Sequence, residues 1–283
     1  MGKAIGFIRL MRPINCAMMG FAVFVGAVLA YPQFFNFDWL GVLYGFLTGF
    51  MLTAASMTVN DYYDRAIDAI NEPSRPIPSG IVSVREALVL VFVLSVVGFA
   101  FAYLTSILCL EVAVISWVVV VTYVTFGKRS GLPGNLLVST CVAIPFIYGS
   151  IAVLSEIPLS VLLFTLMAFL SNTGREITKG IVDVKGDKAE GIKTLAVRYG
   201  EKSAAFAAAA FYVSAVALTP IPWIMNLVSF WFIPFVLVTD IGLVTSSTIL
   251  LNDYSRESAR RIKKLILILF VVGLLAYLVG GLK

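Results

Sequence analysis

Two clusters of acidic residues interrupt a chain that is otherwise mostly apolar. The first cluster lies in segment 60–68, which reads NDYYDRAID, and the second lies in segment 183–187, which reads DVKGD. Carboxylates are costly near a lipid bilayer, so an apolar chain that gathers them at two places is expected to use them. Carboxylate oxygens suit Mg²⁺, which proteins commonly hold together with substrate phosphates. The two clusters therefore predict a site for Mg²⁺ and a diphosphate.

Helical geometry gathers the polar groups of each cluster on one face. At about 100° of rotation per residue, the acidic side chains of the first cluster lie within about 100° of Asn60. Like charges on one face repel each other unless a cation lies among them, although either cluster alone can also be a solvated helix end. The side chains expected to bind the metal are Asn60, Asp61, Asp64, Asp68, Asp183 and Asp187. Those with an expected catalytic role are Asp64, Asp68, Asp183 and Asp187.

Basic and polar side chains near the clusters are the candidate phosphate ligands. Arg175 and Lys179 share a helical stripe with Asp183, and three prolines between positions 73 and 78 stiffen the loop that carries Arg75. This loop can also be a simple helix breaker, and basic residues at the end of a span, such as Lys128, commonly only set topology. The expected substrate-binding residues are Arg12, Asn15, Arg75, Tyr123, Lys128, Arg175 and Lys179.

The composition identifies the class of protein that carries these clusters. The chain has 283 residues, of which 60% are hydrophobic and 13% are charged. Soluble proteins carry about 25% charged residues, so we predict a polytopic membrane protein. Histidine is absent, which excludes histidine-ligated zinc or haem and imidazole acid–base catalysis. We attribute the net charge of +5 to topology and phosphate binding, and we expect no nucleic-acid partner.

Hydropathy predicts an all-α fold with nine transmembrane helices. A helix needs about 20 apolar residues to cross a bilayer. The predicted spans are 13–31, 39–59, 86–106, 108–126, 135–154, 157–175, 203–219, 227–251 and 262–282.

The basic residues predict the orientation of these spans. All of them except Lys283 precede the first span or follow the second, fourth, sixth and eighth spans, so they share one side of the membrane. The positive-inside rule makes that side cytoplasmic. We therefore expect a multi-pass protein of the cell membrane, with the N-terminus and both clusters at the cytoplasmic face. We assign the basic segment 256–264 to topology and to contact with anionic lipid headgroups.

An internal repeat places the two clusters at equivalent positions. The first cluster follows the second span and the second cluster follows the sixth, four spans later. We expect a single domain over residues 1–283, with two related four-helix halves at approximately 1–130 and 131–264 and a ninth helix at 262–282. The polar loops of the two halves would then face each other across a central cavity.

The two motifs resemble those of the UbiA-type intramembrane prenyltransferases. The pattern N-D-x-x-D-x-x-x-D at 60–68 and the pattern D-x-x-x-D at 183–187 are both intact, and the resemblance extends over essentially the whole chain. Within the family, segments 174–179 and 186–195 are most similar to the archaeal digeranylgeranylglyceryl phosphate synthase branch. Segments 70–73 and 75–80 fit that branch and are also similar to chlorophyll synthase.

The resemblance implies Mg²⁺-dependent transfer of a geranylgeranyl group. The donor would be geranylgeranyl diphosphate, and the acceptor would be the hydroxyl of geranylgeranylglyceryl phosphate, a precursor of archaeal ether lipids. The expected partners are thus a prenyl diphosphate, a lipid-like phosphate acceptor and the bilayer. An aromatic or chlorophyllide acceptor is an alternative. A transporter is another, although its path needs polar groups on both sides of the membrane. Asp240, inside the eighth span, either faces the cavity or pairs with a hydroxyl.

Overall fold

The computed structural model describes residues 2–31 and 38–282, and this part of the chain is helical with no β-strand. Lys283, the basic residue predicted on the opposite side of the membrane, lies outside the described residues. The helices are α1 (Lys3–Met11), α2 (Pro13–Ala30), α3 (Trp39–Asn71), α4 (Val84–Thr105), α5 (Ile107–Thr125), the 3₁₀ helix η2 (Gly127–Arg129), α6 (Leu132–Leu154), α7 (Leu159–Ala189), α8 (Leu195–Tyr199), α9 (Glu201–Leu218), α10 (Pro220–Ile224), α11 (Phe232–Asn252) and α12 (Arg256–Gly281).

Nine long helical segments in the described residues correspond to the nine predicted spans. Eight of them are long and apolar enough to cross a membrane, with α1 and α2 counted together and α9 counted with α10. The ninth is α7, whose second half carries charged residues that lower its hydropathy. The prediction of an all-α multi-pass membrane protein is confirmed. The division into two related halves around a central cavity stays a prediction.

Two helices are much longer than the spans predicted for them. Hydropathy ends the spans at residues 59 and 175, whereas α3 has 33 residues and α7 has 31. At about 1.5 Å per residue, each helix is about 45–50 Å long, against about 30 Å for the hydrocarbon core of a bilayer. The two clusters lie on the final turns of these helices, so the chain extends both helices to carry them.

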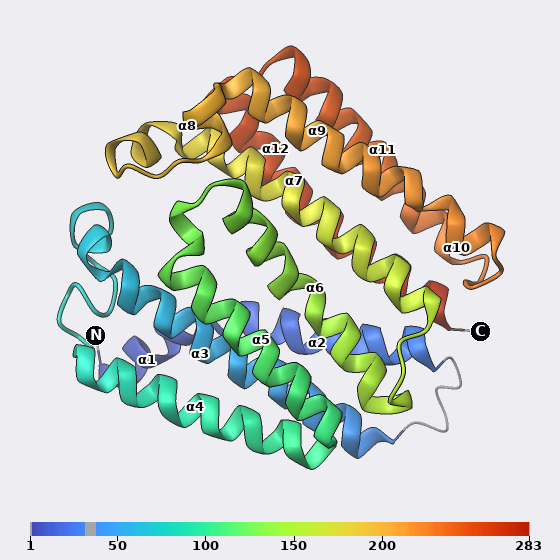
Figure 1. Ribbon diagram of the computed structural model, residues 1–283, viewed down its shortest axis with the longest axis horizontal. Coiled ribbons are helices and arrows are strands. Elements are labelled where there is room, and N and C mark those ends of the chain that lie inside the picture. Colours follow the sequence, from blue (N-terminus) through green and yellow to red (C-terminus); the bar gives the residue numbers. More distant parts are fainter. Residues whose placement is uncertain (1, 32–37, 283) are drawn as a thin grey trace.

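Packing between successive helices forms a closed ring (Figure 1). Each long helix from α2 to α12 packs against the next one along the chain, and α12 returns to contact α2. α2 also packs against α6, and α7 packs against α12, so contacts across the ring join helices that are not successive in the chain. The ring brings the ends of α3, η2, α7 and α12 into one bundle although they are far apart in sequence.

The crossing of α2 and α6 depends on two glycines. A Cβ atom on Gly149 would lie 1.9 Å from the carbonyl oxygen of Val23, and one on Gly26 would lie 2.2 Å from the carbonyl oxygen of Phe146. Small residues let helix backbones approach this closely, which is a common basis of helix packing in membranes.

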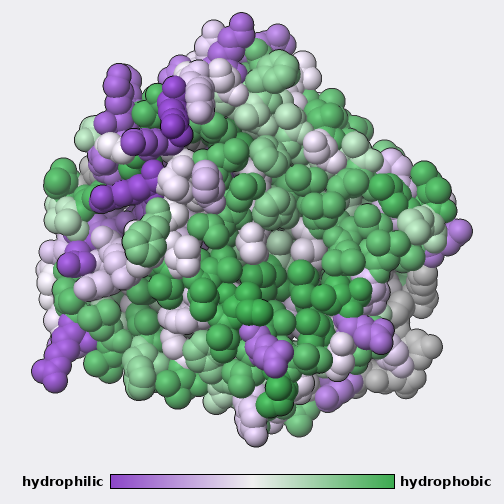
Figure 2. Space-filling model, in the orientation of Figure 1, coloured by the Kyte–Doolittle hydropathy of each residue, from purple (hydrophilic) through white to green (hydrophobic). Residues whose placement is uncertain are grey.

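The molecular surface is mostly apolar, as expected for helices that face lipid. In Figure 2 hydrophobic residues cover the centre of the visible face, and hydrophilic residues gather mainly along its left and upper margin. Figure 1 places α8 and the N-terminal end of the chain along the same margin. Large apolar side chains such as Phe92, Ile115 and Phe206 are at least 60% exposed. Lipid is the solvent in which such exposure is stable.

Candidate active site

The first cluster presents three buried carboxylates on one face of α3. Asp61, Asp64 and Asp68 are 4%, 9% and 6% exposed, and the side-chain amide of Asn60 donates to Asp64 at 3.1 Å. The predicted helical face is therefore formed. Buried carboxylates are stable only when they are paired or bind a cation.

Each of these carboxylates is paired with a cation from a different segment. Arg12 donates to Asp61 Oδ1 at 2.6 Å, and Arg75 donates to Asp68 Oδ2 at 2.6 Å. Lys128 donates to Asp64. Three of the predicted phosphate ligands thus converge on the first cluster, and each of them currently has a carboxylate as its partner.

Local backbone features position these cations. Proline at position 13 disfavours helical geometry at Arg12, which adopts a left-handed conformation with φ 52° and separates α1 from α2. Strained non-glycine residues of this kind cluster at functional sites. Arg75 lies in the proline-containing loop, where its backbone N–H bonds to the carbonyl of Glu72 at 2.9 Å. Lys128 lies in η2, the short turn between α5 and α6.

The second cluster continues a mixed stripe of charges along α7. Arg175 and Lys179 both pair with Glu176, at 2.8 Å and 3.5 Å. Lys179 lies within electrostatic reach of Asp183 as well. Asp187 lies past the residues of α7 predicted to cross the membrane. Burial, followed by the charge of Asp183, raises the pKa of Asp187 to about 6.

Tyr123, near the end of α5, connects the two clusters. It lies within electrostatic reach of Asp64 on α3 and of Lys179 and Glu176 on α7. The loops beside it also meet, because the backbone N–H of Lys193 bonds to the carbonyl of Arg129 at 3.5 Å. The ends of α3 and α7 therefore share neighbours at the same end of the bundle.

One predicted phosphate ligand is not brought to the carboxylates. The side-chain amide of Asn15 is exposed and donates to the sulfur of Met57 at 4.0 Å. Sequence reasoning missed two residues of α12 that do reach α7. The guanidinium Nε of Arg256 donates to the carbonyl of Val182 at 3.0 Å, and Lys263 lies within electrostatic reach of Asp183. The sequence assigned segment 256–264 to topology and headgroup contact alone. The composition of a segment does not show which helix it packs against.

The donor atoms around the clusters are chemically suited to Mg²⁺. They are carboxylate and amide oxygens, with no sulfur or imidazole ligand among the residues named. Within the described residues, no three acidic, cysteine or histidine side chains are grouped so that they could hold a metal ion by themselves.

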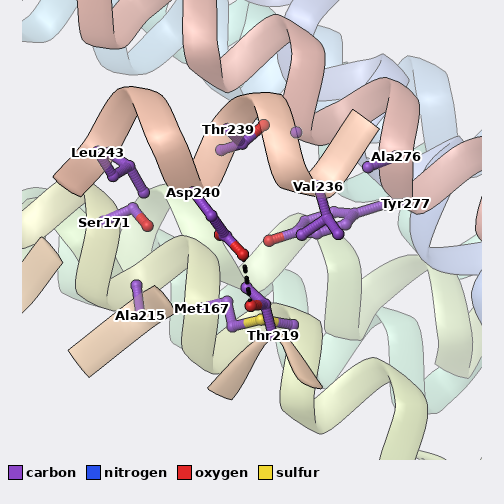
Figure 3. A pocket seen from close by; sticks show the side chains of 11 residues that line it. Met167, Ser171, Ala215, Thr219, Val236, Thr239, Asp240, Leu243, Ala276 and Tyr277 are labelled. Carbon is purple, nitrogen blue, oxygen red and sulfur yellow. Dashed lines mark hydrogen bonds between the residues drawn. The ribbon is translucent and has the colours of Figure 1, made fainter. Parts of the chain in front are cut away.

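Asp240 lies away from the clusters and pairs with a hydroxyl. Thr219 and Asp240 approach to 2.7 Å between side-chain oxygens, beside a cavity of about 30 Å³ between α7, α9, α11 and α12. Figure 3 shows Asp240 and Tyr277 both reaching into this cavity. Of the two interpretations of Asp240 from the sequence, pairing with a hydroxyl is the one observed.

Comparisons with known proteins agree with this geometry. A model of the UbiA prenyltransferase family matches residues 19–280. A relative from Archaeoglobus fulgidus named digeranylgeranylglyceryl phosphate synthase is 38% identical over 278 residues, covering 96% of this chain and 94% of the relative. A solved structure described as giving insights into digeranylgeranylglyceryl phosphate synthase in membranes is 30% identical, with TM-score 0.85 and 99% of each chain covered.

A more distant solved structure shares the fold. A UbiA homologue from Archaeoglobus fulgidus bound to GPP and Mg²⁺ is 18% identical, with TM-score 0.66 and with 96% of this chain and 99% of that chain covered. The family model spans most of the chain, and the relative at 38% identity covers nearly all of it. The chain belongs to the UbiA prenyltransferase family.

Proposed function

We propose that this protein transfers a geranylgeranyl group from geranylgeranyl diphosphate to the hydroxyl of geranylgeranylglyceryl phosphate. The observation that carries the proposal is the pairing of the three buried carboxylates of the first cluster with Arg12, Arg75 and Lys128. The full-length relative named digeranylgeranylglyceryl phosphate synthase supports the choice of substrates. The one-sided distribution of basic residues supports a cytoplasmic location of the site.

The first cluster would receive the donor diphosphate. Its carboxylates, together with those of Asp183 and Asp187, would hold Mg²⁺. A bound Mg²⁺ ion would neutralise negative charge on the leaving group. Arg12, Arg75 and Lys128 would exchange their carboxylate partners for phosphate oxygens. Charge-assisted hydrogen bonds of this kind are strong, and donors fixed before reaction lower the barrier most effectively.

The reaction replaces one C–O bond with another. The bond between the allylic carbon and the diphosphate oxygen breaks, and both of its electrons leave with the diphosphate. The acceptor hydroxyl oxygen forms the ether bond to the same carbon, and its proton passes to the released diphosphate. Residues that hold the acceptor close to that carbon contribute by raising its effective concentration. The apolar faces of the surrounding helices would exclude water from the cationic carbon.

The test is transfer by the purified protein. It would be incubated in detergent with Mg²⁺, labelled geranylgeranyl diphosphate and a panel of acceptors, and the product would be identified by mass. We expect a product with geranylgeranylglyceryl phosphate only when Mg²⁺ is present, and none from Asp64→Ala or Asp183→Ala protein that keeps its helical circular dichroism. Full transfer by either variant would contradict the metal assignment. Solute uptake by proteoliposomes without a prenyl donor would instead support a transporter.

A further inference from the structure

The two clusters lie on helices that do not pack closely against each other in the described part of the chain. The first cluster is near the end of α3 and the second is near the end of α7, and each helix packs against α6 instead. A metal-bound diphosphate that touches both clusters requires a fixed distance between them, since small misplacements of reacting groups are costly. Another part of the chain must therefore set this distance.

The turn between α5 and α6, residues 127–131, is bonded both to the first cluster and to the α7–α8 loop, residues 190–194. The ammonium group of Lys128 donates to Asp64. The backbone carbonyl of the next residue, Arg129, accepts a hydrogen bond from the backbone N–H of Lys193 at 3.5 Å. The turn therefore connects α3 to a loop that begins where α7 ends.

The α7–α8 loop is bonded in turn to the second cluster. The backbone N–H of Ile192 donates to the carbonyl of Asp187 at 2.8 Å, and the side chain of Ile192 is buried. At the other end of the loop, the hydroxyl of Thr194 accepts from the backbone N–H of Val197 and so caps α8. The turn at 127–131 and the loop at 190–194 thus form a continuous strap between the two clusters.

Gly131 is the residue that allows the two parts of the strap to touch. It has φ 75° and ψ −121°, a conformation that L side chains rarely adopt. A Cβ atom at this position would lie 2.2 Å from the carbonyl oxygen of Lys193 and 3.5 Å from the Cα atom of Thr194. Backbone atoms cannot turn aside as a flexible side chain can, so a larger residue at position 131 must move the turn away from the loop.

Hydrophobic packing supports the same contact. Leu132, the first residue of α6, packs against the core cluster that contains Ile177 and Ile181 of α7 and Ala196 of α8. Gly131 itself is buried. The start of α6 is therefore anchored against α7 and α8, and the strap is part of the packed structure rather than a loose surface contact.

We propose that Gly131 is a positioning residue of the transfer reaction, because the contact that it allows sets the distance that a metal-bound diphosphate must span between the clusters. This inference rests on the proposed function, which supplies the ligand that bridges them. It adds a residue that lies outside both acidic motifs.

The kinetic test compares Gly131→Ala with Gly191→Ala. Gly191 lies in the partner loop with φ 70°, and a Cβ atom there would meet nothing within 4 Å. Both variants therefore force alanine into a left-handed conformation, but only Gly131→Ala separates the strap. For Gly131→Ala, we expect kcat to fall about 10- to 100-fold, and the KM for geranylgeranyl diphosphate and the half-maximal Mg²⁺ concentration to rise about tenfold. Gly191→Ala should stay within about twofold of the wild type in all three.

A purely structural role of Gly131 would give a different pattern. Partial misfolding lowers the amount of active protein, so the apparent kcat would fall while the KM for the donor and the Mg²⁺ requirement stayed unchanged. That pattern would overturn the proposal. Equal effects of Gly131→Ala and Gly191→Ala would do the same, since they would make backbone strain the cause.

A disulfide across the strap measures the contact without any substrate. The backbone contact between Arg129 and Lys193 brings these residues close enough for Arg129→Cys and Lys193→Cys to form a disulfide. We expect the disulfide to form at least about ten times more slowly when Gly131→Ala is added, because the two thiols are then held apart. Equal rates would overturn the proposal.

The same disulfide provides a test if Gly131→Ala does not fold. With Gly131 in place, the disulfide locks the arrangement that the structure already has. The oxidised protein is therefore expected to transfer within about twofold of its reduced form. Loss of transfer on oxidation, with recovery on reduction, would show that the strap must open during the reaction and would contradict the positioning role.

Donor binding separates this inference from the proposed function. Binding of geranylgeranyl diphosphate with Mg²⁺ to the full chain would be measured without any acceptor. If the wild type transfers nothing but binds the donor at least about tenfold more tightly than Gly131→Ala does, the proposed function fails and the strap stands. If the wild type transfers and the two proteins bind the donor equally, the strap fails and the proposed function stands.

Discussion

The ammonium group of Lys128 donates a hydrogen bond to Asp64, although 64 positions of sequence separate the two residues. The contact closes the turn between α5 and α6 over the end of α3. It pairs a predicted phosphate ligand with a predicted metal ligand, so each group holds the other in place. Binding of a metal and a diphosphate would provide both with new partners of opposite charge.

Removal of the Lys128 ammonium is expected to impair transfer strongly. Lys128→Met roughly keeps the length of the side chain but leaves Asp64 with only the amide of Asn60 as a donor, and it removes one donor to the leaving group. Loss of a single preorganised donor commonly lowers kcat about 100- to 1000-fold. Initial rates at saturating substrate would measure the effect.

Arg129→Met is the matched control for this prediction. Arg129 is the exposed neighbour of Lys128 in η2, and its contact with the α7–α8 loop uses its backbone carbonyl, which the substitution keeps. We expect transfer close to that of the wild type. Equal losses in Lys128→Met and Arg129→Met would show that only the net charge of the turn matters.

The sequence predicted what depends on local periodicity and missed what depends on packing. The common face of Asn60, Asp61, Asp64 and Asp68 follows from helical rotation alone, and the structure has it. The sequence analysis missed the extension of α3 past residue 59. Hydropathy detects apolar spans and cannot show that the polar residues after a span remain helical. The hydrogen bond from Arg256 to the carbonyl of Val182 depends on how α12 packs against α7, which no short pattern encodes.

The site prediction divides in the same way. Lys128 was selected as a ligand because a basic residue near Tyr123 could reach the same cavity as the clusters, but its carboxylate partner could not be named without the fold. The roles assigned to the metal and phosphate ligands remain predictions that the substitutions described above test.

The Mg²⁺ requirement is expected to depend on pH through Asp187, whose pKa is raised to about 6, first by burial and then by the charge of Asp183. A carboxylate binds a metal ion only after losing its proton, so Mg²⁺ and the proton compete for this group. Below about pH 6 the protonated form of Asp187 predominates, and this form does not bind Mg²⁺. The Mg²⁺ concentration for half-maximal transfer should therefore rise about tenfold between about pH 8 and pH 5.

Saturating Mg²⁺ serves as the control for this competition. Excess metal should recover at about pH 5 most of the rate that is lost at limiting metal. A half-maximal Mg²⁺ concentration that does not change with pH would show that Asp187 is not a ligand.

The close approach of α2 and α6 is expected to make Gly149 intolerant of any side chain. A Cβ atom there would lie 1.9 Å from the backbone oxygen of Val23, and a backbone atom cannot move aside as a flexible side chain can. Gly149→Ala should therefore lower the free energy of unfolding. Overpacking typically costs about 1–3 kcal/mol, and we expect a loss at least as large here. The unfolding temperature in detergent would measure this.

Gly273→Ala provides the comparison within a helix of the same bundle. Its Cβ atom would lie 3.7 Å from the side chain of Thr239, which is ordinary contact. Alanine is preferred over glycine within a helix by about 1 kcal/mol, so this variant should be at least as stable as the wild type. Equal unfolding temperatures for the two variants would exclude steric contact as the basis of the α2–α6 crossing.

Asp240 is expected to act as a neutral hydrogen-bonding group. The hydroxyl of Thr219 lies 2.8 Å from the carbonyl of Val216 and 2.7 Å from Asp240, yet it has only one proton. Both contacts are satisfied when Thr219 donates to Val216 and a protonated Asp240 donates to Thr219. Within a bilayer the neutral acid also avoids the cost of burying a charge.

Substitution by asparagine tests this protonation state. The amide of Asp240→Asn has nearly the shape of the neutral acid and keeps a donor for Thr219, so its free energy of unfolding should stay within about 0.5 kcal/mol of the wild type. Asp240→Ala removes the partner and should cost about 1–3 kcal/mol. Thermal unfolding of both variants in the same detergent would compare them. If asparagine is as destabilising as alanine, the position needs a negative charge, and Asp240 must then be ionised.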